Sequence, residues 1–203
     1  MKNKEHWDHV FSTKSPQDVS WTQEYPETAM TYLEALQLPK TAQIIDIGGG
    51  DSNLAGALLE KGYENIWVLD ISAAALDKAK KRLGNLAEKV HWIVSDITEF
   101  EPEMSFDFWY DRAVFHFLTE EDEIRKYVEK VSHAIPANGH FLLGTFSENG
   151  PKKCSGLDIK QYSETAMKKR FSENFEAVKC FTEDHITPFE TKQNFQFCGF
   201  KKL

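Results

Sequence analysis

The stretch that decides the fold is Gln43-Ile-Ile-Asp-Ile-Gly-Gly-Gly-Asp-Ser52, a short apolar run followed directly by three glycines. A β-branched run of this length predicts a buried strand, and the amphipathic segment 53–61 predicts a helix after it. Glycines between a strand and a helix let the backbone come close to a ligand, because they carry no Cβ. The stretch therefore predicts a strand, a ligand-binding turn and a helix.

Strands and helices alternate from this point toward the C-terminus. Further strands are expected at 66–69, 90–94, 106–110 and 140–146, and further helices at 73–83, 120–134 and 163–171. This alternation predicts an α/β fold with a doubly wound, mostly parallel sheet. The last two expected strands, 176–182 and 195–201, have no helix between them, so they should pair antiparallel at the edge of the sheet.

Composition narrows the class of protein. The chain has 203 residues and a net charge of −8, which fits one domain and disfavours nucleic acid or an anionic membrane as partner. The N-terminus has no apolar signal segment, and no run is long enough to span a membrane. The chain has three cysteines, Cys154, Cys180 and Cys198. Their odd number and their lack of C-x-x-C spacing favour free thiols in a reducing compartment. We therefore expect a cytoplasmic protein.

Three kinds of ligand compete for the glycine turn. A dinucleotide fingerprint needs G-x-G-x-x-G, but Asn53 stands at its third glycine, and Asp51 would place a negative charge beside a pyrophosphate. A P-loop would need a following Gly-Lys-Ser/Thr, which is missing. The third interpretation is a ligand without phosphate but with a cationic end, because Asp46 can accept hydrogen bonds from an ammonium group. S-adenosylmethionine (SAM) is such a ligand.

Two further acidic residues follow the next two expected strands. Asp70, with Ile71 beside it, comes 24 residues after Asp46 and is placed to bind both hydroxyls of a ribose. Asp96 follows the third strand, where it can bind an adenine amino group while Ile97 contacts the ring. Together they favour a ligand that contains adenosine, either a dinucleotide or SAM.

From about Thr41 onward the sequence resembles the class I SAM-dependent methyltransferases. Asp46, Gly48 and Gly50 match the acid and the first two glycines of their D/E-x-G-x-G-x-G loop, while Ser52 stands at the third glycine. The resemblance implies a Rossmann-like fold with an antiparallel C-terminal edge strand, SAM as cofactor and S-adenosylhomocysteine (SAH) as product. The cofactor-binding residues that it implies are Asp46, Gly48, Gly49, Gly50, Asp70, Ile71, Asp96 and Ile97.

A narrower resemblance involves segments along nearly the whole chain. Trp7-Asp8, Ser20-Trp21, the segment 107–117 and Cys154-Ser-Gly-Leu157 look like a small bacterial subgroup. That subgroup is similar to the thiopurine, trans-aconitate and citrate-synthase-lysine methyltransferases. It implies a small-molecule or protein acceptor and leaves open whether that acceptor is a thiol, a carboxylate, an amine or a protein lysine.

The segment Trp109-Tyr-Asp-Arg-Ala-Val-Phe-His-Phe117 follows the fourth strand, where such folds present the acceptor. We expect Asp111 and Arg112 at the methionine end of the cofactor, or fixing the loop by ion pairing, with Asp111 also a catalytic candidate. His116 is a candidate general base because its ordinary pKa lies near neutrality. The alternative is that His116 packs between Phe115 and Phe117. Trp21 should either cover the cofactor as a lid or pack in the core.

The expected organisation is a single methyltransferase domain over residues 1–203. Residues 1–38 would form an N-terminal arm or lid, 41–203 the SAM-binding core, and 147–162 a loop that presents Cys154 near the acceptor. We expect a monomer and no metal, because His6, His9 and Cys180 show no ligand spacing. A SAM-binding regulatory domain without turnover and a nicotinamide oxidoreductase are the alternatives.

Overall fold

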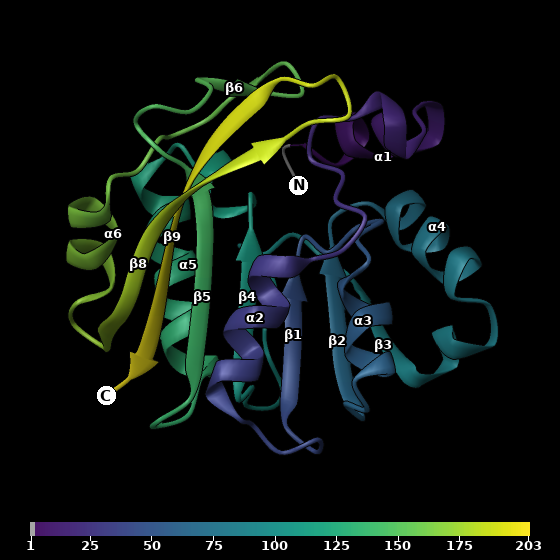
Figure 1. Ribbon diagram of the computed structural model, residues 1–203. Coiled ribbons are helices and arrows are strands. Elements are labelled where there is room, and N and C mark those ends of the chain that lie inside the picture. The colour runs from purple at the N-terminus through teal and green to yellow at the C-terminus, as the bar shows by residue number, and fades with distance from the viewer. Residues whose placement is uncertain (1–2) are drawn as a thin grey trace.

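A computed structural model of the chain describes residues 3–203, so the first two residues of the expected arm lie outside the described part. Seven strands form one sheet in the order β3-β2-β1-β4-β5-β9-β8 (Figure 1). Neighbours among β1 to β5 are parallel, whereas β9 runs antiparallel to both β5 and β8. The strands are β1 (Gln43–Ile47), β2 (Asn65–Asp70), β3 (Val90–Val94), β4 (Phe108–Arg112), β5 (His140–Phe146), β8 (Phe175–Ile186) and β9 (Lys192–Lys202).

This sheet confirms the predicted α/β class, the mostly parallel arrangement and the antiparallel pair at the edge. Within that pair β8 is outermost, and the C-terminal strand β9 lies between β8 and β5. The fourth strand begins two residues later than predicted, because Phe106 packs into the core from the preceding loop and its N–H donates to the carbonyl of Ala134 at 2.8 Å. As a result β4 extends through Asp111 and Arg112.

Among residues 3–203, six helices accompany the sheet. They are α1 (Lys4–Thr13), α2 (Glu27–Leu36), α3 (Leu54–Glu60), α4 (Ala73–Leu83), α5 (Glu121–Ala134) and α6 (Glu164–Phe171). The described residues also form three short 3₁₀ turns: η1 (Pro16–Asp18) between α1 and α2, η2 (Gly84–Lys89) between α4 and β3, and η3 (Phe115–Phe117) between β4 and α5. Helix α4 has the bounds that its sequence predicts: Ser72 Oγ accepts from the N–H of Ala75 at 3.2 Å, and Gly84 ends the helix with a φ of +57°.

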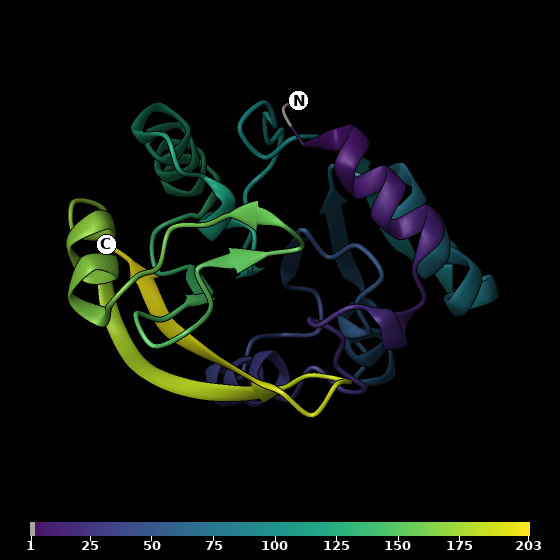
Figure 2. The ribbon, with the colours of Figure 1, turned by 90° about the horizontal axis from the view of Figure 1, so that it is seen from above.

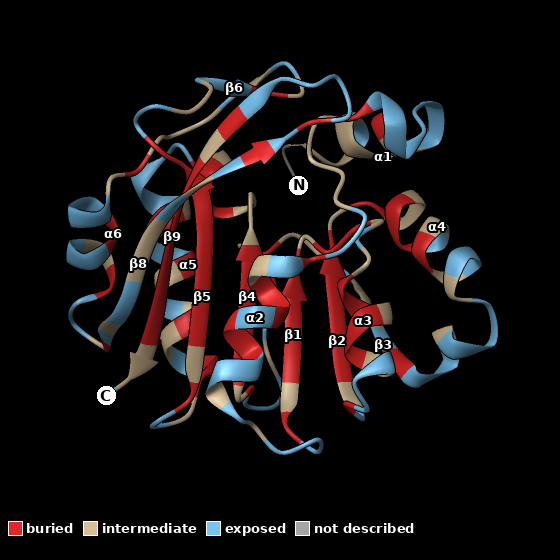
Figure 3. Cartoon of the chain, in the orientation of Figure 1, coloured by how far each residue is buried: buried red, intermediate tan, exposed pale blue. Residues whose placement is uncertain are grey.

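Two apolar cores lie on opposite faces of the sheet, because side chains alternate along each strand. Ile45, Trp109 and Phe141 pack with α5 and α6 on one face. Ile44 and Phe108 pack with α2 and α3 on the other face. The central strands are consequently buried along most of their length (Figure 3).

The carboxyl ends of the parallel strands are covered by an N-terminal helix and by a hairpin that follows β5. Helix α1 packs beside α4, and a small hairpin of β6 (Lys153–Cys154) and β7 (Leu157–Asp158) extends over the same edge (Figure 2). Helix α2, also within the expected arm, instead packs on a sheet face. The two segments outside the predicted alternation therefore supply the cover of this edge.

The expectation of free thiols was wrong for two of the three cysteines. Cys180 on β8 and Cys198 on β9 stand opposite each other in the antiparallel pairing and form a disulfide. Cys154 is free and buried. The cysteine-based argument for a reducing compartment is lost with this bond. In the described part of the chain, no helix has the length and apolar character needed to span a membrane.

Candidate active site

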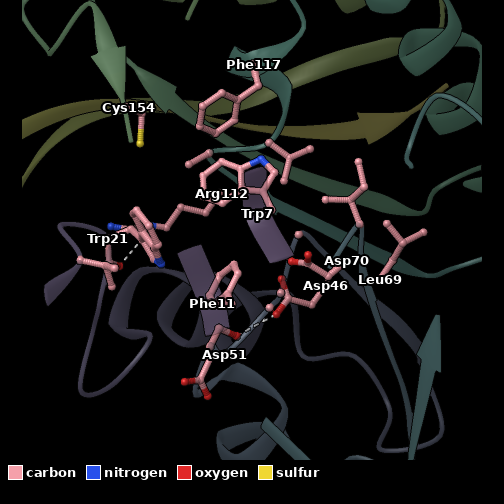
Figure 4. A pocket seen from close by; sticks show the side chains of 18 of the residues that line it. Trp7, Phe11, Trp21, Asp46, Asp51, Leu69, Asp70, Arg112, Phe117 and Cys154 are labelled. Carbon is pink, nitrogen blue, oxygen red and sulfur yellow. Dashed lines mark hydrogen bonds between the residues drawn. The ribbon is translucent and has the colours of Figure 1, made fainter. Parts of the chain in front are cut away.

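A cavity of about 470 Å³ lies at the carboxyl ends of β1, β2 and β4, under α1 and the β6–β7 hairpin (Figure 4). Its volume falls in the range of small-molecule sites. Among the predicted site residues, Asp111 and His116 do not line it. Those that do line it are Trp21, Asp46, Gly48, Gly49, Gly50, Asp70, Ile71, Asp96, Ile97 and Arg112.

The glycine turn brings bare backbone to the cavity. Gly48 and Gly50 adopt positive φ values of +65° and +46°, which residues other than glycine rarely adopt. A Cβ at Gly49 would lie 2.6 Å from Asp46 Oδ2. The N–H groups of Gly48 and Gly49 donate to the carbonyl of Leu69, at 2.7 and 3.2 Å, which ties the turn to β2.

Two buried carboxyls, from Asp46 and Asp70, line the same cavity. Asp46 Oδ2 accepts from Ser52 Oγ at 3.0 Å, and Asp70 Oδ1 accepts from the N–H of Ser72 at 2.8 Å. Burial raises the pKa of each to about 7, and for Asp46 the charges of Asp111 and Asp70 add to the rise. Carboxyls in such surroundings are stabilised by a ligand that brings positive charge or hydroxyl donors.

Asp96 lies at the cavity beyond the end of β3. Its Oδ1 accepts from both the N–H and the Oγ1 of Thr98, at 2.9 and 2.8 Å, so one carboxylate oxygen holds the turn. Ile97 is buried in the core next to this turn and also lines the cavity. The turn therefore presents an acid and an aliphatic side chain side by side.

Asp111 holds the loop that follows β4. Its Oδ1 accepts from the N–H of Val114 at 2.9 Å, and its Oδ2 accepts from the hydroxyl of Tyr127 at 2.5 Å. Burial raises the pKa of Asp111 to about 7. The carboxyl thus fixes the loop by accepting hydrogen bonds, whereas the sequence analysis offered a place at the methionine end of the cofactor or ion pairing as the alternatives.

His116 is fully buried and lies behind the cavity wall. Its Nδ1 accepts from the N–H of Phe146 at 3.3 Å, and its ring contacts those of Phe117 and Phe146. Burial, with a contribution from the nearby Arg112 charge, lowers the pKa of His116 to about 3. The imidazole is therefore neutral near pH 7 and surrounded by aromatic side chains.

An aromatic cluster from the arm and from η3 covers the cavity. The ring centroid of Trp7 lies 5.6 Å from that of Trp21 and 5.2 Å from that of Phe117. Phe11, one helical turn after Trp7, lies over the glycine turn, 3.3 Å from where a Cβ of Gly50 would be. Sequence reasoning missed Phe11 and the helix that carries it, although the Trp7–Phe11 spacing of four residues is typical of one helix face.

Arg112 and Cys154 line the part of the cavity nearest to Trp21 (Figure 4). Arg112 Nη1 donates to the carbonyl of Trp21 at 3.0 Å, and its guanidinium carbon lies 4.6 Å from the ring centroid of Phe195. Burial lowers the pKa of Arg112, and it raises that of the Cys154 thiol to about 12, which keeps the thiol protonated. Within residues 3–203 no three His, Cys, Asp or Glu side chains are grouped to hold a metal ion.

Part of the chain is similar in sequence to known methyltransferases. Residues 44–139 match the family described as methyltransferase domain. Nodulation protein S of Rhizobium tropici is 29% identical over 94 residues, which is 45% of this chain and 39% of that protein. The mouse eEF1A lysine and N-terminal methyltransferase is 24% identical over 68% of this chain, but over only 20% of its own length. The chain thus spans between a fifth and two fifths of the length of these relatives.

Solved structures share the fold over almost the whole chain. A SAM-dependent methyltransferase from Anabaena variabilis superimposes with a TM-score of 0.76 at 14% identity, covering 98% of this chain and 93% of that one. The N-methyltransferase NodS from Bradyrhizobium japonicum, in complex with SAH, superimposes with a TM-score of 0.66 at 16% identity, covering 98% of each chain. Residues 44–139 thus match the methyltransferase-domain family, and the Rossmann-like sheet with its glycine turn has the fold of solved SAM-dependent methyltransferases.

Proposed function

We propose that the protein transfers the methyl group of SAM to a small-molecule or protein acceptor and releases SAH. One observation carries this proposal: the glycine turn, Asp46, Asp70 and Asp96 line a single cavity at the carboxyl ends of adjacent parallel strands. This edge is where open α/β sheets bind their ligands. The matched methyltransferase domain supports the same activity.

Five of the residues that line the cavity have a proposed contact with the cofactor. Asp70 binds the two ribose hydroxyls, and Asp46 lies toward the ammonium group of the methionine end. Asp96 and Ile97 hold the adenine, one by hydrogen bonding and the other by apolar contact. Trp21 covers the bound cofactor together with α1. The buried carboxyls support these contacts, because a positive charge or hydroxyl donors would stabilise their ionised forms.

The proposed reaction is an in-line displacement. The bond from the methyl carbon to the acceptor atom forms as its bond to sulfur breaks, and the sulfonium becomes a neutral thioether. Because the donor is already activated, the protein acts by aligning the two reactants and excluding water. Asp111 and His116 lie outside the cavity lining, so we propose that they position the loop after β4 and take no proton.

We propose one functional unit in which the arm, up to about residue 38, serves as lid, and a monomer that acts in the cytoplasm on acceptors other than nucleic acid. The net charge of −8 supports the last point. Size-exclusion chromatography with light scattering measures the oligomeric state. Alkylation of thiols before lysis, followed by mass spectrometry, shows whether the Cys180–Cys198 bond exists in the cell.

The test of turnover is incubation of the protein with methyl-labelled SAM and a fractionated cell extract. We expect the label in one acceptor fraction together with a matching amount of SAH, and mass spectrometry then identifies the methylated atom. Binding of SAM without label transfer to any fraction would instead support a regulatory domain that senses SAM. The Asp70→Ala variant, which should lose cofactor affinity, serves as the control for background methylation.

A further inference from the structure

Arg112 presents unused hydrogen-bond donors beside the cavity. Its Nη1 donates to the carbonyl of Trp21, but its Nε and Nη2 are buried and have no hydrogen-bond partner in the structure. No carboxylate among residues 3–203 forms an ion pair with this guanidinium. A buried cation without a counterion is unfavourable, so it indicates a place for an anionic group that comes from outside the chain.

The carboxylates whose charges act on Arg112 each accept a hydrogen bond from another residue. Glu183 accepts from the hydroxyl of Thr28 at 2.5 Å, and Asp46 accepts from Ser52. On its other side, the guanidinium stacks on the ring of Phe195, which is buried and apolar. The protein therefore holds the Arg112 side chain in place without neutralising it.

We propose, on the basis of the methyltransferase function above, that Arg112 binds the carboxylate of a small-molecule acceptor. A planar guanidinium with free Nε and Nη2 atoms can donate two parallel hydrogen bonds to one carboxylate. Trp21, Phe117 and Leu157 add apolar surface to the same cavity, which fits an acceptor with an aromatic or aliphatic body. The acceptor class is therefore a carboxylic acid with an apolar body.

The methionine end of the cofactor also carries a carboxylate, so the two sources must be separated. Figure 4 shows Arg112 reaching toward Trp21 on the side of Cys154, whereas Asp46 and Asp70 lie across the cavity. We assign this guanidinium to a separate acceptor molecule; the carboxylate of the cofactor is the alternative, and the first arm of the test decides between them. A lysine side chain of a protein acceptor would meet repulsion from the guanidinium.

The first arm of the test measures cofactor binding by titration calorimetry. SAH and 5′-methylthioadenosine, which lacks the amino-acid end, are titrated into the wild type, Arg112→Gln and Arg125→Gln. Arg125 is a matched surface control on α5, paired with Asp122 and Glu129. We expect SAH affinity to stay within about threefold in both variants, a difference well below the tenfold that equals about 1.4 kcal/mol. A tenfold loss of SAH affinity in Arg112→Gln, with methylthioadenosine unchanged, would assign Arg112 to the cofactor and overturn the proposal.

The second arm uses SAH-saturated protein and matched acid and amide probes: benzoate and benzamide, phenylacetate and phenylacetamide, and cinnamate and cinnamamide. In the wild type and in Arg125→Gln, at least one acid should bind about tenfold more tightly than its amide, because only the acid forms a charge-assisted pair. Arg112→Gln should abolish this preference, and Arg112→Lys should retain part of it. Equal binding of every acid and its amide, or a preference that survives in Arg112→Gln, would contradict the proposal. A wild type that binds no SAH would instead refute the methyltransferase function itself.

Discussion

At the scale of single residues, the site depends on carboxyls that are buried before any ligand arrives. Asp46, Asp70 and Asp111 each have a pKa raised to about 7, with burial as the largest cause. The first two line the cavity, and the third holds the adjoining loop. Their positions were predictable, because the carboxyl ends of parallel strands meet at one edge of a sheet. Which of them would face the cavity was not, since that depends on the path of each loop.

Replacement of Asp70 tests the ribose contact. Asp70→Ala should weaken SAH binding by about 2 kcal/mol or more, roughly 30-fold, because two hydroxyls lose a charged acceptor. Asp77→Ala, on the exposed side of α4, is the control and should leave the affinity unchanged. Titration calorimetry measures both variants. Unchanged SAH affinity in Asp70→Ala would show that the ribose lies elsewhere.

Replacement of Asp46 tests the buried carboxyl through pH. The pKa of Asp46 is about 7 in the folded protein against an ordinary value of 3.8, so the folded state binds the proton more tightly than the unfolded state. The wild type should therefore lose free energy of unfolding relative to Asp46→Asn as the pH rises from about 4 to about 7, by at most roughly 1.4 kcal/mol per pH unit. Above pH 7 the difference should be constant. Urea unfolding of the ligand-free proteins between pH 5 and 8 measures this difference in free energy of unfolding. A difference that does not change with pH would refute the raised pKa of Asp46.

At the scale of elements, the loop between β4 and η3 shapes the part of the cavity that we propose for the acceptor. Ala113 in this loop has a φ of +74°, an unusual conformation for a residue with a Cβ, and its neighbours are held by Asp111. Its N–H donates to the carbonyl of Gly144 at 2.8 Å, which ties the loop to β5. The backbone is thus held in a strained conformation next to Arg112.

Glycine at this position should relieve the strain. Relief of about 1 kcal/mol is offset in part by the greater flexibility of glycine in the unfolded chain, so Ala113→Gly should change the free energy of unfolding by less than about 1 kcal/mol, in the stabilising direction. Ala166→Gly, at an exposed position in α6, is the matched control and should destabilise the protein by about 1 kcal/mol. Urea unfolding compares the two variants. Equal destabilisation by both would show that Ala113 carries no strain.

The elements also show what could be predicted from the sequence. Helix α4 was predicted with its correct bounds because Ser72 and Gly84 are chemical signals at its two ends. Helix α1 lacks such signals: Asn3 before it makes no side-chain capping bond, and its aromatic residues face a cavity instead of a core. Elements whose ends and apolar faces are locally encoded were therefore found, and those that depend on tertiary contacts were missed.

At the scale of the whole molecule, the C-terminal pair β8 and β9 closes one edge of the sheet and is crosslinked. The disulfide could not be predicted because Cys180 and Cys198 are 18 residues apart, and only the register of the antiparallel pair places them opposite each other. Phe195 and Phe197 on β9 pack in the core beneath the Arg112 side of the cavity. The crosslinked pair therefore supports the wall against which the proposed acceptor binds.

Removal of the crosslink should lower stability. The double variant Cys180→Ala and Cys198→Ala should lose about 3 kcal/mol of free energy of unfolding, the value expected for a closed loop of this length. Denaturant unfolding without reductant measures the loss, and reduction of the wild type should reproduce it. Cys154→Ala gives the separate cost of removing a free, buried thiol. A stability that responds neither to the double variant nor to reductant would contradict a structural role for the bond.

We propose that this sheet edge binds SAM as the donor of a methyl group. The most direct measurement is titration calorimetry of the wild type with SAM, SAH and NAD under the same conditions. Binding of SAM and SAH at one site per chain, with no heat from NAD, is the expected result, because Asn53 stands where the dinucleotide fingerprint has its third glycine. Binding of NAD with no heat from SAM or SAH would contradict the claim.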